Sequence, residues 1–207
     1  MSLPSPAIEW LDETQSTNAD ARERALAGAR GPLWIAARRQ LAGRGRRGRA
    51  WTGLEGNLFT TGLYTFQAEP GRVAELSFAA ALAVAEVCDT ALRDPAATRV
   101  KWPNDVLVNR RKVSGILLES GQAPGGGLWL ALGIGINLAA APDDSERPAT
   151  SLAAAGGAIS REQALDTLVD AFERWRRRWL QDGFGPLRDG WLARAHGLGE
   201  RCEARLQ

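Results

Sequence analysis

The sequence predicts an α+β fold in which helices flank a mixed, largely antiparallel sheet. Three observations support this. Short strand-like segments outnumber the helical ones, several of them are joined by hairpin turns, and the order of elements does not follow a regular βαβ pattern. The chain has 207 residues, of which 44% are hydrophobic and 24% are charged, as expected for one globular domain. No apolar stretch is long enough to span a membrane.

The N-terminal half contains three predicted strands and two predicted helices. The strands are short and rich in apolar or β-branched residues, and they are expected at 8–11, 33–39 and 57–66. The first helix is expected at 19–29, where alanine and arginine predominate. The second, at 73–93, is apolar on nearly all sides, so it should be buried, and Asp94-Pro95 should end it.

The following segment predicts four more strands. They are expected at 98–102, 106–108, 112–120 and 128–138. Pro103 should stop the first of them, a hairpin turn should form at 109–111, and a glycine turn at 125–127 should precede the last. Residues 139–159 predict a loop with one short helical piece.

The C-terminal part predicts two helices and the beginning of a strand. Ser160 and Gln163 form a capping box, and Gly183 should lie just past the end of the helix that they open. Large apolar residues share one face of this helix: Leu165, Leu168, Val169, Phe172, Trp175 and Trp179. A shorter helix is expected at 186–195, and residues 200–207 resemble the first strand of a further unit.

The run Gly43-Arg44-Gly45-Arg46-Arg47-Gly48-Arg49-Ala50-Trp51 is the most informative segment for function. Its glycines permit unusual backbone dihedrals, its arginines suit phosphate or carboxylate oxygens, and its tryptophan offers a flat face for a purine. The run therefore predicts either a flexible loop that closes over an anionic, nucleotide-like ligand or a basic loop that touches nucleic acid. The net charge of only +2 disfavours a general nucleic-acid binder.

Ser16-Thr17-Asn18 has two interpretations. Thr17 with Asp20 could cap the following helix, which is the more common role of such residues. Alternatively, two hydroxyls and a carboxamide could donate to and accept from a neutral ureido or amide ligand.

Lys101-Trp102-Pro103-Asn104-Asp105 predicts a site at a strand end, because lysine suits a phosphate, aspartate a magnesium ion and asparagine a sugar or phosphate. An ordinary Asn-Asp turn is the alternative. Only two of the 26 basic residues are lysines, Lys101 and Lys112, and both fall in this region. This predicts a role for a compact ammonium that a guanidinium does not serve; chance clustering of two rare residues is the alternative.

Taken in order, these motifs resemble those of the biotin–protein ligases. The resemblance covers about residues 8–195 and rests on 16–18, Gln40 with 43–51, 101–105, 112–115 and 133–137. It implies a catalytic domain related to class II aminoacyl-tRNA synthetases, assigned to residues 1–195. Residues 196–207 would begin a C-terminal SH3-like β-barrel that is mostly absent. An N-terminal DNA-binding domain would have no room before residue 16, so the ligase-only type, without DNA binding, is expected.

The resemblance also implies roles for individual residues. Biotin would contact Ser16, Thr17, Asn18, Gln40, Arg44, Gly45, Arg46, Lys112 and Gly115. ATP and the adenylate would contact Arg46, Arg49, Trp51, Asn104, Asp105 and Asn137. Lys112, Lys101 and Arg46 would be catalytic, with Lys101 near the α-phosphate, and Asp105 would be a candidate Mg²⁺ ligand.

The implied reaction has two steps and a protein substrate. Biotin and ATP give biotinyl-5′-adenylate, and biotin then passes to one lysine of a biotin carboxyl carrier protein domain of a biotin-dependent carboxylase. A cytoplasmic enzyme is expected, because two scattered cysteines do not form a disulfide framework and no signal peptide is evident. A homodimer is compatible with the resemblance. A lipoate or octanoate ligase of the same superfamily is the nearest alternative, and a nucleic-acid-binding module using 43–51 is the alternative of another class.

Overall fold

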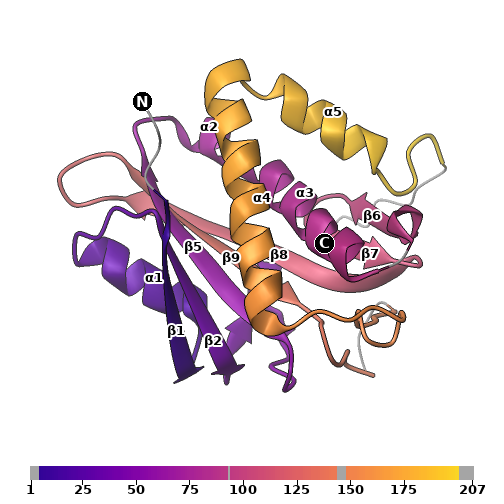
Figure 1. The fold of residues 1–207 in the computed structure, drawn as a ribbon. Coiled ribbons are helices and arrows are strands. Elements are labelled where there is room, and N and C mark those ends of the chain that lie inside the picture. Colours follow the sequence, from indigo (N-terminus) through magenta and orange to yellow (C-terminus); the bar gives the residue numbers. More distant parts are fainter. Residues whose placement is uncertain (1–4, 93, 144–147, 201–207) are drawn as a thin grey trace.

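The computed structural model describes residues 5–92, 94–143 and 148–200. Within these ranges seven strands form one sheet in the order β1-β2-β5-β9-β8-β7-β6 (Figure 1). Their bounds, in the same order, are Ala7–Thr14, Leu33–Gln40, Leu58–Phe66, Leu128–Ile136, Arg111–Gln122, Asp105–Val108 and Thr98–Lys101. Only the β1–β2 pair is parallel among these neighbours, which confirms the mixed, largely antiparallel sheet.

Helices cover both faces of the sheet, and the two sides have separate cores. The helices are α1 (Thr17–Leu26), α2 (Pro70–Ala74), α3 (Leu76–Ala91), α4 (Arg161–Asp182) and α5 (Gly185–Ala193). In Figure 1, α3, α4 and α5 gather on one side, where the larger core forms. Helix α1 packs on the other side through Ala21 and Ala25, against a smaller core. None of the described helices is both long and apolar enough to cross a membrane.

The alternation of residue size along β9 determines where the site forms. Its leucines and isoleucines at even positions, 128 to 136, belong to the larger core. The intervening residues include Ala131, Gly133 and Gly135, which face the α1 side. Because successive side chains of a strand point to opposite faces, one face is filled and the other keeps open space.

Most predicted elements are present, with shifted ends. The capping box of Ser160 and Gln163 is confirmed, and Gly183 has φ 73° past the end of α4. The strand expected at 8–11 is longer, because it pairs along its length with β2. Residues 151–157 form hydrogen-bonded turns instead of a helix. The expected strand at 200–207 lies almost entirely outside the described residues.

The buried helix predicted at 73–93 is confirmed as α3, but its beginning differs: residues 73 and 74 belong to the separate short helix α2, which meets α3 at Glu75. At the junction the backbone hydrogen bonds connect residues three positions apart instead of four: the Glu75 N–H donates to the Arg72 carbonyl and the Phe78 N–H donates to the Glu75 carbonyl. Such bonds tighten the turn and interrupt the α-helical pattern.

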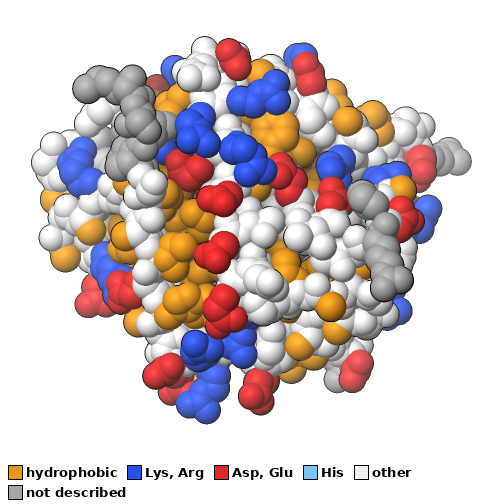
Figure 2. All heavy atoms as spheres, viewed as in Figure 1, with side chains coloured by type: hydrophobic (Ala, Val, Ile, Leu, Met, Phe, Trp, Pro, Cys, Tyr) orange, Lys and Arg blue, Asp and Glu red, His pale blue; other side chains and the backbone are white. Residues whose placement is uncertain are grey.

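The face over α4 shows mixed charge. Figure 2 shows a line of acidic side chains on this face, with basic side chains around it. The exposed acidic residues of α4 include Glu162, Asp166 and Asp170. Since nucleic-acid-binding surfaces are broadly basic, this face does not extend the arginine-rich run into a nucleic-acid-binding surface.

Candidate active site

A cavity of about 700 Å³ opens on the α1 side of the sheet. Its walls come from the start of α1, the ends of β5, β8 and β9, the arginine-rich segment and the turn between β6 and β7. All predicted site residues except Lys101 line it: Ser16, Thr17, Asn18, Gln40, Arg44, Gly45, Arg46, Arg49, Trp51, Asn104, Asp105, Lys112, Gly115 and Asn137. The structure thus brings together residues more than 120 positions apart.

One end of the cavity is built from buried, uncharged polar groups. Helix α1 begins at Thr17, and its N-cap Ser16 makes no side-chain cap hydrogen bond. The interpretation of Thr17 as a helix cap is therefore wrong. Its backbone N–H donates to Gln40 Oε1 at 3.0 Å, and its hydroxyl lies 2.8 Å from Thr61 Oγ1. The side chains are positioned by β2 and β5, not by the helix end.

Asn18 lies against the sheet because β9 has no side chain there. A Cβ atom at Gly133 would lie 2.0 Å from Asn18 Oδ1, so only glycine leaves room. The Asn18 carboxamide is held on both sides: Nδ2 donates to Glu119 Oε2 at 2.7 Å, and Oδ1 accepts from Thr61 Oγ1 at 2.7 Å. The sequence analysis missed Glu119 and Thr61. Both residues lie on strands that carry other polar residues as well, so no signal in the sequence singled them out.

The Trp51 indole packs over Gly135 of β9 and Gly115 of β8, where the absence of side chains leaves space for it. A Cβ at Gly135 would lie 2.4 Å from Trp51 Cε2, and a Cβ at Gly115 would lie 2.9 Å from Trp51 Cζ3. The indole N–H is buried and has no hydrogen-bond partner among the described residues. Buried donors are nearly always paired in folded proteins, so this one is suited to a bound acceptor.

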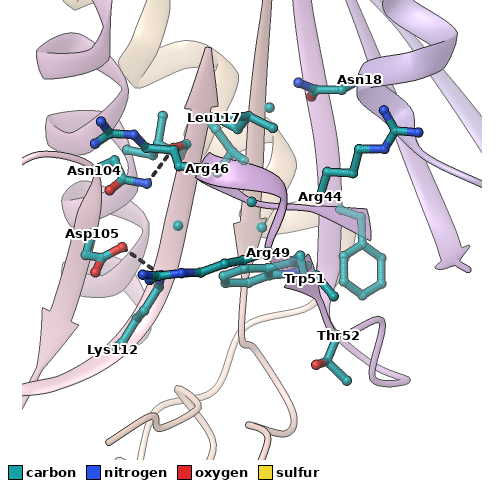
Figure 3. A pocket seen from close by; sticks show the side chains of 18 of the residues that line it. Asn18, Arg44, Arg46, Arg49, Trp51, Thr52, Asn104, Asp105, Lys112 and Leu117 are labelled. Atoms are coloured by element: carbon teal, nitrogen blue, oxygen red, sulfur yellow. Dashed lines mark hydrogen bonds and ion pairs between the residues drawn. The ribbon is translucent and has the colours of Figure 1, made fainter. Parts of the chain in front are cut away.

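The opposite end of the cavity is charged. Lys112 Nζ lies 2.7 Å from Asp105 Oδ1 and 5.4 Å from the centroid of the Trp51 ring. Asp105 is 6% exposed. In Figure 3, Asn18 and Arg44 lie at one end of the view and Asn104 and Asp105 at the other, with Trp51 between them. The cavity therefore joins an end where the buried side chains of residues 16–18 are uncharged, with Arg44 beside them, to an end where Lys112 and Asp105 form an ion pair.

The arginine-rich run is a short hairpin instead of an irregular loop. Strands β3 (Gly43–Arg44) and β4 (Ala50–Trp51) pair with each other, and a 3₁₀ turn, η1 (Arg46–Gly48), joins them. Arg47 has φ 58° and Gly48 has φ 73°, which is the left-handed region that a tight reversal requires. The hairpin holds its exposed arginines at the rim of the cavity.

The structure adds contacts or a position that the sequence did not predict for three of the site residues: Lys101, Asn137 and Asn104. Lys101 is not among the residues that line the cavity, although its strand partner Asp105 and the following residue Trp102 are. Asn137 lines it, but its amide also fixes the chain after β9: Nδ2 donates to the Thr150 carbonyl and Oδ1 accepts from Asn57. Asn104 Nδ2 donates to the Ile116 carbonyl at 2.9 Å, which ties the β6–β7 turn to β8.

The described residues do not fit a resident magnesium ion. No group of three His, Cys, Asp or Glu side chains gathers among them. Asp105 is a single carboxylate in the cavity wall, and Lys112 already holds one of its oxygens. Magnesium commonly binds through one or two carboxylates together with substrate phosphates, so any ion here would arrive with a nucleotide.

Comparison with known proteins defines the family. The pattern of the Biotin/lipoate A/B protein ligase family matches residues 9–137. This chain belongs to that family. It is 44% identical to the biotin–[acetyl-CoA-carboxylase] ligase of Paracoccus denitrificans, over 94% of this chain and 83% of that protein. It is 34% identical to the bifunctional ligase/repressor of Bacillus subtilis, of which it spans 62%.

Solved structures agree with this assignment. The biotin protein ligase of Aquifex aeolicus, in complex with biotin and ATP, superposes with a TM-score of 0.80 at 28% identity, over 94% of this chain and 80% of that one. The Leishmania major ligase in complex with biotinyl-5-AMP gives a TM-score of 0.80 at 26% identity, over 98% and 86% of the two chains. The fold is therefore that of the biotin protein ligases.

Proposed function

We propose that the chain activates biotin with ATP to biotinyl-5′-adenylate and transfers biotin to a specific lysine of a biotin carboxyl carrier protein domain of a biotin-dependent carboxylase. The observation that supports this most strongly is the composition of one cavity. It has a buried, uncharged polar end at residues 16–18 and an ionic end at Lys112 and Asp105. Biotin has a matching arrangement, with a neutral ureido ring at one end and a carboxylate at the other. The named relatives above are ligases of this kind.

In the first step, a biotin carboxylate oxygen attacks the α-phosphorus of ATP, and pyrophosphate leaves. Two anions must approach, so positive charge has to be placed before the reaction. Lys112 would orient the carboxylate, and Arg46 and Arg49 would lie on the phosphate side. Trp51 would pack against the adenine, with Asn104, Asp105 and Asn137 near the nucleotide. Lys101, the strand partner of Asp105, would lie near the α-phosphate although it does not line the cavity itself.

In the second step, the amine of the acceptor lysine attacks the acyl carbon, AMP leaves, and the nitrogen loses a proton. The mixed anhydride must be protected from water until the acceptor arrives. The hairpin at 43–51, which edges the cavity, is suited to cover it. Mg²⁺ would enter as the MgATP complex. We place this activity in the cytoplasm and without DNA binding.

Family membership alone does not separate biotin from lipoate, because the family includes ligases for both. The polar end favours biotin. Lipoate and octanoate have apolar chains, and burying Thr17 and Asn18 against such a chain would leave hydrogen-bonding groups unmatched. The nucleic-acid alternative leaves this polar end and Lys112 without a role.

Pyrophosphate release tests the proposal. The purified chain with ATP is expected to release pyrophosphate with biotin and not with lipoate or octanoate. Transfer is then measured by mass spectrometry on a carrier domain, with the acceptor Lys→Arg domain as the control. Equal release with biotin and lipoate, or none with any acid, would contradict the proposal.

A further inference from the structure

We propose that Glu119 is a positioning residue for biotin: it fixes the direction of a hydrogen-bond chain that makes the Thr17 hydroxyl an acceptor for a ureido N–H. This inference rests on the proposed function. Glu119 lies on β8, does not line the cavity and belongs to none of the sequence motifs. It acts through Asn18, whose Nδ2 lies 2.7 Å from Glu119 Oε2.

The direction of the chain follows from which atoms have hydrogens. A carboxylate can only accept, so the atom of Asn18 that faces Glu119 must be the amide nitrogen. The carbonyl oxygen of Asn18 then faces Thr61 Oγ1 at 2.7 Å. Since a carbonyl oxygen can only accept, the single hydroxyl hydrogen of Thr61 is committed to Asn18.

The same argument extends to Thr17. Its hydroxyl lies 2.8 Å from Thr61 Oγ1, whose hydrogen is already used. Thr17 must therefore be the donor in this contact. Its other neighbour, Gln40 Oε1, is farther away at 3.3 Å and already accepts from the Thr17 backbone N–H at 3.0 Å. With its hydrogen committed to Thr61, the Thr17 oxygen can offer only lone pairs to the cavity.

An acceptor at this position selects for a ligand N–H. A ureido group has two N–H donors and one carbonyl, whereas the acyl chains of lipoate and octanoate have none there. Apart from Glu119, the residues of this hydrogen-bond network are at most 9% exposed. Competition from water for their hydrogen bonds is therefore limited. The sheet keeps the members in register, because Glu119 and Thr61 lie on β8 and β5, which both pair with β9.

Removing the charge of Glu119 would remove this fixed direction. A glutamine at 119 has both an amide donor and a carbonyl acceptor, so it would allow Asn18 in either orientation. In the reversed hydrogen-bond chain Asn18 donates to Thr61 and Thr61 donates to Thr17. The Thr17 hydrogen then has Gln40 Oε1, 3.3 Å away, as its acceptor within the protein, and whenever it turns towards the cavity it faces the ligand N–H, which is also a donor.

The test uses calorimetric titration of the whole chain with biotin and with desthiobiotin, which keeps the ureido ring. Glu119→Gln is expected to weaken both ligands by a similar factor, about tenfold, as for the loss of one buried hydrogen bond. ATP affinity and the melting temperature should not change. Glu23→Gln is the matched control, because it removes the same charge from an exposed position on α1, the helix that contains Asn18.

A double-mutant cycle separates positioning from a general structural effect. If Glu119 acts through Asn18, then Glu119→Gln should add nothing in an Asn18→Ala background. Wild-type biotin affinity in Glu119→Gln, or full additivity in the cycle, would overturn the inference and leave the proposed function standing. Absence of biotin binding by the wild-type chain would overturn both.

Discussion

Replacement of Lys112 by arginine is expected to be non-conservative. The ammonium lies 2.7 Å from Asp105 Oδ1. A Cβ atom added at Gly115 would lie 3.3 Å from Lys112 Nζ and 2.9 Å from Trp51 Cζ3. Lysine, glycine and indole therefore meet around one small space that admits a compact charge. A planar guanidinium is wider and would displace either Trp51 or the substrate carboxylate.

The magnitudes follow from these contacts. A misplacement of about 1 Å can cost roughly 100-fold in rate, and Lys112→Arg should approach this loss in adenylate formation. Lys112→Ala removes a hydrogen bond to a charged group, worth about 1.5–3 kcal/mol, which corresponds to roughly 10- to 150-fold. The assay is biotin-dependent pyrophosphate release at saturating ATP.

The matched controls are Arg110→Lys and Arg111→Lys. Both arginines are exposed, at the turn between β7 and β8, and neither lines the cavity. Each should release pyrophosphate at close to the wild-type rate. If Lys112→Arg is as active as wild type in a folded protein, the argument from the size of the charged group is refuted, while the family assignment stands.

Three further predictions concern other parts of the molecule. Gly135→Ala should slow adenylate formation, because its Cβ would displace Trp51, whereas Gly71→Ala, with open space around it, should not. Hydrogen exchange of residues 43–51 should slow when biotin and ATP bind, as an anion relieves repulsion among the arginines; unchanged exchange would contradict the covering role. Burial and the neighbouring Glu173 raise the pKa of Tyr64 well above 10.0. The neutral phenol therefore stabilises the fold fully below pH 10, and this contribution is lost as pH rises towards the raised pKa. Absorbance of this single tyrosine at alkaline pH should show tyrosinate only with unfolding, and earlier ionisation would contradict its buried position.

Several local features of the fold follow from neighbouring residues and were predicted correctly. The capping box at Ser160 and Gln163, the glycine that ends α4 and the hairpin at 109–111 all depend on residues a few positions apart. Apolar patterning likewise fixed which segments are strands, and the order of motifs identified the family. The ends of strands and helices shifted by a few residues, and the first strand became longer because it pairs along its length with β2.

Which polar groups contact one another depends on the folded arrangement of the strands. Asn18 and Glu119 are 101 positions apart, and their contact exists because β8 and β9 pair and Gly133 leaves space for the carboxamide. Thr17 suggested a helix cap because its near neighbours permit one. It instead bonds to groups from β2 and β5, because the folded sheet brings them to the buried start of α1. Lys101 has the residue type for phosphate contact, but in the folded chain it does not line the cavity, whereas Asp105, its partner on β7, does. Residue type and spacing indicate what a side chain can do, whereas strand order and the faces of the sheet decide which partners it can reach.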